Sequence, residues 1–315
     1  MNDASQTTST GQPPSNDRPN RATDSYSRGI VFILIASFWF TIMAAAAKAA
    51  AAHDIPSPLI VLARSAFTGS VVAVYMVTRG ISFRSRATLA LHGRCFFGTL
   101  SLQLYFFALA NAPLADTVVL ANTQPLFIPF LAILFLGERP RPFLYVPILL
   151  GFSGVVTLVG PTDAEWSPGL LAGVGIGAAG ACAGVCLKKA TASEHSMTII
   201  FVFSMWTFVT SLPALIWYDM GIMDDAVIEL LLVGISALGA QLFLTWAYAR
   251  APASLLSPLG YAGVLISYAI GFFVFEELPS SRAFLGGGLI VMACSFTSWK
   301  ASSLVRVAGD SHERH

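Results

Sequence analysis

The stretch ALANAPLADTVVLANTQPLFIPFLAILFLGERP, residues 108–140, has a counterpart later in the chain. Shifted by 139 positions, it aligns with AYARAPASLLSPLGYAGVLISYAIGFFVFEELP, residues 247–279. Each segment has an Ala-Pro pair near its start and closes on a Glu-x-Pro triplet, with a long apolar run between them. Self-similarity at a fixed spacing indicates that a chain is built from repeated structural units. The sequence therefore predicts two repeats.

The composition excludes most classes of soluble protein. Of 315 residues, 55% are hydrophobic and only 11% are charged, whereas a typical soluble domain carries about 25% charged residues. The mean hydropathy is +0.70. A net charge of +1 gives no case for nucleic-acid binding, which needs clustered basic surface. We therefore expect an integral membrane protein surrounded by a lipid bilayer.

Ten apolar runs have the length of about 20 residues that a helix needs to cross the hydrocarbon core. In the first repeat, residues 29–160, they span 29–51, 57–78, 89–110, 114–136 and 142–160. In the second repeat, residues 161–300, they span 168–188, 197–218, 227–249, 253–275 and 283–300. Residues 1–28 are rich in Ser, Thr, Asn and Pro, so we expect a disordered cytosolic tail there. Residues 301–315 are expected to form a second cytosolic tail.

Basic residues indicate the orientation of these spans, because loops on the cytosolic side carry an excess of Lys and Arg. With the N-terminus inside, 15 of the 18 basic residues fall on the cytosolic side. Five spans per repeat is an odd number, so the repeats must cross the membrane in opposite directions. Such inverted repeats exchange access to a site near the midplane in many transporters. The expected fold is all-α, with ten transmembrane helices in two inverted repeats and both termini cytosolic. The 15 basic residues assigned to the cytosolic side are Arg18, Arg21, Arg28, Arg79, Arg84, Arg86, Arg94, Arg139, Arg141, Lys188, Lys189, Arg250, Lys300, Arg306 and Arg314.

Polar side chains gather within several of the predicted spans. Amides, hydroxyls and aromatic rings that converge on an apolar cavity suit a small amphipathic molecule. Hydrogen bonding between neighbouring helices explains any single one of them equally well, so the prediction concerns the group. The candidate substrate-binding residues are Arg64, Gln103, Tyr105, Asn122, Gln124, Gln241, Trp246, Ser257 and Tyr261.

Ionisable residues inside a span are costly and usually face a cavity or a partner. Arg64 can hold a carboxylate or phosphate with its planar fork of donors, or it can cap carbonyls or reach the interface. Lys48 lies one turn from the interface, so a side chain that extends to the interface is the simpler explanation for it. Glu138 and Glu277 end equivalent spans, and we expect each carboxylate to accept hydrogen bonds from the N–H groups of the next helix. Proton-coupled gating is the alternative for both glutamates.

No catalytic group, metal site or cofactor is expected. The five histidines, His53, His92, His195, His312 and His315, offer no paired ligands inside the spans. Cys182 and Cys186 lie four apart in an apolar run with no second ligand pair nearby, which is typical of small packing residues. The chain has neither a GxxxxGK phosphate loop nor a GxSxG nucleophile elbow, which disfavours ATP-driven transport by this chain alone and serine-type hydrolysis.

The repeated segments quoted above, the Lys48 that ends the first span and the LIVLARSAF run around Arg64 resemble the drug/metabolite transporter superfamily, in its EamA-type branch. The resemblance covers about residues 29–300. It implies a ten-helix, two-repeat carrier for amino acids, nucleotide-like metabolites, vitamins, polyamines or drugs, by import or export. The second half departs from the pattern, because Ser204 stands near the place of an arginine comparable to Arg64.

The sequence therefore predicts a secondary transporter of a small organic metabolite in the inner or plasma membrane. An amino acid or related compound, a vitamin or a nucleotide-like metabolite is the expected substrate, with a proton or another ion as a candidate coupling partner. Two alternatives stay open. An intramembrane enzyme acting on a lipid-linked substrate would need acidic or histidine pairs, and a sensor without flux would not need the polar residues inside the spans.

Overall fold

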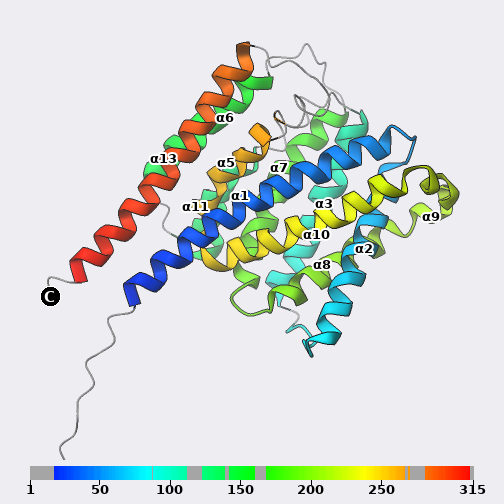
Figure 1. The fold of residues 1–315 in the computed structure, drawn as a ribbon, viewed down its shortest axis with the longest axis horizontal. Helices are drawn as coiled ribbons and strands as arrows, with labels where there is room; N and C mark the ends of the chain where they lie inside the picture. The colour runs from blue at the N-terminus through cyan, green and yellow to red at the C-terminus, as the bar shows by residue number, and fades with distance from the viewer. Residues whose placement is uncertain are drawn as a thin grey trace, which may run out of the picture.

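The computed structural model describes residues 18–86, 88–111, 123–138, 142–159, 168–266, 269 and 281–312. Every regular element in those ranges is a helix (Figure 1). The longer helices are α1 (Arg18–Ala51), α2 (Ser57–Thr78), α3 (Leu89–Asn111), α5 (Gln124–Leu136), α6 (Tyr145–Val159), α7 (Pro168–Ala190), α8 (Ser196–Ser211), α10 (Val227–Arg250) and α13 (Ser281–His312). The shorter ones are η1 (Pro142–Leu144), α9 (Ala214–Trp217), η2 (Met220–Ala226), α11 (Ala253–Leu256) and η3 (Ser257–Tyr261).

Several helices begin and end where the apolar runs do. The bounds of α2 are those of the predicted second span, and α3 and α10 begin at the predicted residues. Within the described residues, four helical stretches are long and apolar enough to cross a membrane by themselves. They are Ser25–Ala51, Ser57–Thr78, Ser196–Trp217 and Met220–Arg250.

Several boundaries differ from the prediction, three of them most clearly. The first helix begins at Arg18, so residues 18–28 are helical rather than part of a disordered tail. Extending an existing helix adds a hydrogen bond for each residue fixed, and Pro19 is tolerated because it lies in the first turn. At the other end, α13 continues to His312. The predicted seventh span is divided at Pro213, whose missing N–H separates α8 from α9.

Four helix pairs make the most extensive packing contacts: α3 with α7, α1 with α10, α6 with α13, and α2 with α8. Glycines allow two of these close approaches. Gly239 of α10 lies against the Trp39 indole of α1, and Gly175 of α7 lies against the Leu104 side chain of α3. Both sites have no room for a larger side chain without movement of the neighbour.

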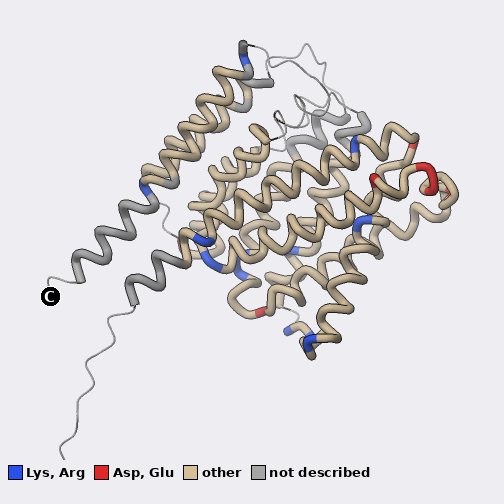
Figure 2. The backbone as a smooth tube through the Cα atoms, in the orientation of Figure 1, with Lys and Arg blue, Asp and Glu red and all other residues tan. Residues whose placement is uncertain are grey.

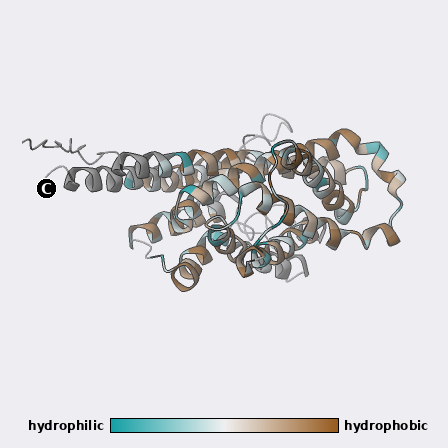
Figure 3. Ribbon diagram, turned by 90° about the horizontal axis from the view of Figure 1, so that it is seen from below, coloured by the Kyte–Doolittle hydropathy of each residue, from teal (hydrophilic) through white to brown (hydrophobic). Residues whose placement is uncertain are grey.

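The outer surface of the bundle is strongly apolar. Side chains such as Val77, Leu134, Ile216 and Phe284 are more than two-thirds exposed, and Figure 3 shows hydrophobic residues along most of the helices. Soluble monomers rarely expose contiguous apolar patches of this kind. Lipid contact explains this surface, and it also explains why the interior holds the polar groups.

Charge is divided between the ends of the bundle. Figure 2 shows most of the described acidic residues gathered near α9, whereas a group of basic residues lies at the end of the bundle where α10 stops. This division follows the separation of basic and acidic connections in the sequence.

Candidate functional site

Two buried arginines face the same aromatic ring in the interior of the bundle. Arg64 of α2 is 2% exposed and Arg94 of α3 is 5% exposed. The guanidinium carbons of Arg64 and Arg94 lie 5.9 and 4.2 Å from the ring centroid of Phe203 on α8. The Nη2 atom of Arg94 also donates a hydrogen bond of 3.0 Å to Oε1 of Gln241 on α10. Four helices therefore meet at one polar site, which we call the arginine site (Arg64, Arg94, Phe203 and Gln241).

Gly98 makes room for the Arg94 side chain. It lies one turn after Arg94 on α3, and a side-chain carbon placed on it would overlap the Arg94 guanidinium. The same carbon would lie 2.9 Å from Cε2 of Phe203. The guanidinium can therefore lie along its own helix only because residue 98 has no side chain.

The arginine site has more hydrogen-bond donors than partners. Among the described residues, four buried side-chain atoms lack a partner: the Nε atoms of Arg64 and Arg94 and the hydroxyls of Thr68 and Thr99. All four belong to α2 and α3, the two helices whose arginines contact Phe203. Burying a charged group costs several kcal/mol, and a cation–π contact returns only about 0.5–2 kcal/mol. The site is thus rich in positive charge that its described neighbours do not neutralise.

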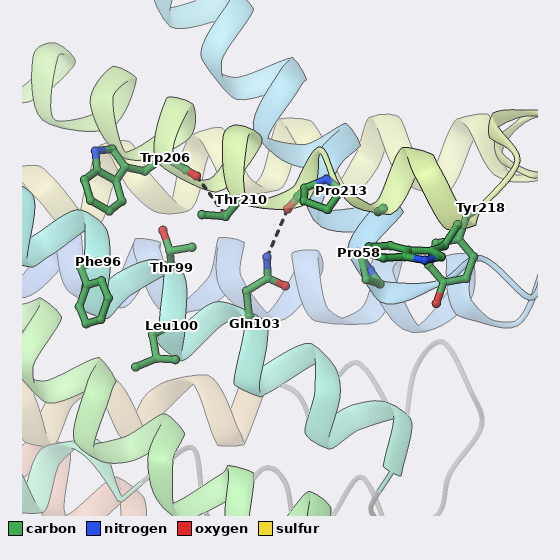
Figure 4. A pocket seen from close by; sticks show the side chains of 12 residues that line it. Pro58, Phe96, Thr99, Leu100, Gln103, Trp206, Thr210, Pro213 and Tyr218 are labelled. Atoms are coloured by element: carbon green, nitrogen blue, oxygen red, sulfur yellow. Dashed lines mark hydrogen bonds between the residues drawn. The ribbon is translucent and has the colours of Figure 1, made fainter.

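A pocket of about 470 Å³ runs between α3 and α8 (Figure 4), and none of the four arginine-site residues is among those that line it. Thr99, which follows Gly98, lines it together with the ring of Trp206. Farther along, Gln103 donates a hydrogen bond of 3.2 Å to the Ser211 hydroxyl. The walls also include Pro58, Phe96, Leu100, Thr210, Pro213, Ala214, Trp217 and Tyr218. The pocket thus joins apolar walls to a few polar groups, as small-molecule sites do.

A second polar group lies on the side of α7 that carries Gly180 and Gly184, which we call the glycine face. The Gln124 side chain, at the start of α5, lies beside Gly180 and Gly184. The Tyr248 hydroxyl of α10 lies beside Gly184 as well. At the end of α7, Lys188 Nζ donates a hydrogen bond of 2.8 Å to the Tyr248 carbonyl. Gln124 therefore lies between helices, against the glycine face of α7.

Glu138 connects the two halves of the chain. Its carboxylate accepts hydrogen bonds from the backbone N–H groups of Ala253 and Ser254, at 3.0 and 3.3 Å, and one of 2.8 Å from the Ser254 hydroxyl. These donors form the N-terminus of α11. The carboxylate was expected to cap the next helix along the chain, but it caps a helix of the other half instead.

The structure brings only some of the predicted substrate-binding residues together. Arg64 and Gln241 belong to the arginine site, Gln103 lines the pocket, and Gln124 lies on the glycine face. Asn122 and Glu277 lie outside the described residues.

Four other candidates pack elsewhere. Tyr261 is fully buried against Gly151 of α6, and its hydroxyl donates a hydrogen bond of 3.2 Å to the Ile148 carbonyl. Trp246 packs on Phe32 of α1, and its ring centroid lies 5.8 Å from that of Phe32. The remaining two are Ser257, which donates to the Ser254 carbonyl within its own turn, and Tyr105, which packs among apolar side chains.

Lys48 lies on the exposed side of α1 near its end. This position agrees with a side chain that reaches the membrane interface.

Arg94 is the functional candidate that sequence reasoning missed. It was counted among the cytosolic basic residues, but it points into the bundle. The signal was present, because Arg94 falls inside the apolar run that begins at Leu89, with small Gly98 one turn away. The residue therefore does not contribute to the basic excess that indicates orientation.

Tyr261 is expected to have a structural role only. Tyr261→Phe removes one hydrogen bond to the Ile148 carbonyl, which should lower the free energy of unfolding by about 1 kcal/mol and leave transport unchanged. Unfolding in detergent and flux in vesicles would measure the two effects. A stable Tyr261→Phe variant that has lost flux would contradict this assignment.

Together, the apolar surface, the spans and the interior polar site define a helical multi-pass membrane protein. The chain belongs to the EamA-like transporter family, whose sequence pattern matches it twice, at residues 27–160 and 167–299. This family is part of the drug/metabolite transporter superfamily.

Several relatives cover most of the chain. It is 30% identical over 275 residues to the pseudopaline exporter CntI of Pseudomonas aeruginosa, covering 86% of this chain and 96% of that protein. It is 28% identical over 284 residues to the riboflavin transporter of Vibrio cholerae, covering 87% and 94%. It is 27% identical over 201 residues to the S-adenosylmethionine uptake transporter of Rickettsia felis, covering 64% and 67%. Both the family and these relatives are transporters, not enzymes.

A solved crystal structure shares the fold. It is 23% identical to this chain and has a TM-score of 0.72, covering 88% of this chain and 98% of its own. The likeness supports the helical architecture described above.

Proposed function

We propose that this chain is a secondary active transporter that moves a small organic metabolite across the inner or plasma membrane by alternating access. The observation that carries the proposal is the position of the arginine site. Its members come from α2 and α3 of the first half and from α8 and α10 of the second half. A site at the contact of two halves changes its access when one half moves against the other.

The proposal includes ten membrane spans in two inverted repeats, divided as residues 29–160 and 161–300. The packing of the helices supports it. If the repeats exchange places, α1 corresponds to α7 and α10 to α3, so the α1–α10 contact becomes the α7–α3 contact. The other two extensive pairs, α2 with α8 and α6 with α13, map onto themselves. A two-fold relation between the halves accounts for all four pairs.

We further propose that both termini are cytosolic. The basic residues that remain after the removal of Arg94 still lie mainly in the connections assigned to that side. Connections rich in Lys and Arg stay in the cytosol during membrane insertion.

The substrate that fits this site is a small molecule with an apolar body and a polar end. The pocket offers Phe96, Leu100 and Trp206 for the body, and the arginine site beyond Thr99 is the place that we propose for the end. Relatives named for pseudopaline, riboflavin and S-adenosylmethionine support a metabolite of this kind. An amino acid or related compound, a vitamin or a nucleotide-like metabolite is the class that we propose.

Flux in proteoliposomes tests the function. Purified protein should move labelled members of a panel of amino acids, vitamins and nucleotides faster than protein-free vesicles, and an imposed proton gradient should change the rate if a proton is coupled. Import and export are separated by the direction of the imposed gradient. A panel in which no compound crosses faster than in empty vesicles would refute the proposal and favour a sensor without flux.

A further inference from the structure

We propose that Arg64 and Arg94 together bind an oxyanion, a carboxylate or phosphate group, of the transported molecule. The inference rests on the proposed function for the role of the bound molecule, but the binding itself can be measured without transport. Arg94 thereby joins Arg64 as a substrate-binding residue, and the polar end of the transported molecule carries a negative charge.

The first step is the charge balance of the arginine site. Among the described residues, neither guanidinium has a carboxylate within ion-pair distance. Both guanidinium carbons instead lie near the Phe203 ring, at 5.9 and 4.2 Å from its centroid. Buried charges in proteins are usually paired with an opposite charge, and an oxyanion would supply that charge to both arginines at once.

The second step is the set of donors. The Nε atoms of Arg64 and Arg94 and the hydroxyls of Thr68 and Thr99 are buried and without partners in the described part of the chain. A carboxylate or phosphate presents several lone pairs and accepts strong hydrogen bonds from guanidinium groups. A cation could not use these arginine donors, and a neutral amide would leave the two charges unneutralised.

The third step is the orientation of Arg94. The Gln241 carbonyl oxygen accepts from Nη2 of Arg94, and the Phe203 ring lies 4.2 Å from its guanidinium carbon. The absence of a side chain at Gly98 leaves space for this arrangement. Arg94 is therefore held in place before a ligand arrives, which lowers the cost of ordering on binding.

The fourth step is access. Thr99 belongs both to the unpartnered donors and to the wall of the pocket. The pocket continues from there to Trp217, which is 73% exposed. Neither arginine lines the pocket itself, so the proposal places the anionic end beyond Thr99 and the rest of the molecule against the apolar walls.

Thermal unfolding of the full-length protein in detergent tests this inference with simple probes. The probes are sodium acetate and inorganic phosphate, with sodium chloride at matched ionic strength as the reference and acetamide as the neutral counterpart of acetate. A ligand that binds only the native state raises the apparent melting temperature. We expect a saturable rise with acetate or phosphate, and none with acetamide.

Variants assign the effect to the two arginines. In Arg64→Gln and in Arg94→Gln, the anion concentration that gives half of the rise should increase roughly tenfold or more. Without anion, both variants should be as stable as the wild type or more stable, since each removes a buried unpaired charge. The control is Arg79→Gln, because Arg79 is an exposed arginine whose guanidinium lies over the Tyr75 ring. This variant should keep the wild-type response.

Three results would overturn the inference: no rise with either anion above chloride, the same rise in Arg64→Gln and Arg94→Gln as in the wild type, or an equal rise with acetamide. Loss of stability in both glutamine variants without anion, with recovery in Arg64→Lys and Arg94→Lys, would likewise assign the arginines to folding. Flux without an anion response would leave the transporter intact and remove only the anion site. An anion response without flux would support the anion site and refute the proposed transport.

Discussion

Gly98→Ala is expected to reduce transport at least about tenfold while the protein stays folded. The added methyl group would overlap the Arg94 guanidinium and press on Phe203. Arg94 has a flexible side chain that can turn away, so the backbone does not need to move. Alanine also favours a helix over glycine by about 1 kcal/mol, which offsets part of the strain. The variant therefore separates the position of one arginine from the stability of the fold, and initial rates in proteoliposomes measure it.

Gly288→Ala is the matched control. Gly288 is an exposed helical glycine of α13, and no heavy atom lies within 4 Å of a carbon placed on it. The same substitution there should leave the rate unchanged and the stability equal or slightly higher. If Gly98→Ala transports at the wild-type rate, Arg94 does not need its observed position and the arginine site is not the functional one.

Glu138→Ala is expected to destabilise the protein by about 2 kcal/mol or more. The substitution removes one carboxylate but leaves three donors unpaired, the N–H groups of Ala253 and Ser254 and the Ser254 hydroxyl. It also removes a negative charge from the N-terminus of α11, where the helix dipole favours one. Because the contact joins the two halves, transport should fall together with stability. Denaturant unfolding in detergent gives the first quantity.

Glu194→Ala serves as the comparison for Glu138→Ala. The Glu194 carboxylate also accepts a backbone hydrogen bond, 2.8 Å from the Arg86 nitrogen, but at an exposed position. Water can replace an acceptor there, so we expect a loss of at most about 0.5 kcal/mol. Equal losses of stability in the two variants would show that the Glu138 contact does not stabilise the association of the two halves.

The sequence predicted the bounds of several described helices well, because a bilayer imposes one simple length on apolar runs. Ser57–Thr78 and the start of α10 at Val227 follow directly from the change between apolar residues and turn-forming ones. The errors have local causes. The first helix extends past its apolar part to Arg18. Pro213 divides the seventh predicted span, although the residues that follow it are still hydrophobic.

The site was predicted only in part, because a span fixes the depth of a residue but not the direction that it faces. Tyr261 and Trp246 are polar-tipped residues at suitable depths, yet they face α6 and α1. Arg94 lies near the basic connection and was grouped with it, although its side chain turns inward beside Gly98. Which face of each helix meets the others depends on long-range packing, and that packing is not readable from a single apolar run.

Alternating access to the pocket is the central claim, and a single cysteine in place of Thr99 tests it most directly. The four native cysteines, Cys95, Cys182, Cys186 and Cys294, are replaced first, and the resulting protein must retain flux. Membrane-impermeant thiol reagents are then applied to oriented vesicles from one side or the other. We predict that Thr99→Cys is labelled from both sides of the membrane. A transported compound should raise the labelling rate from one side and lower it from the other. Labelling from one side only, unchanged by any transported compound, would contradict the account.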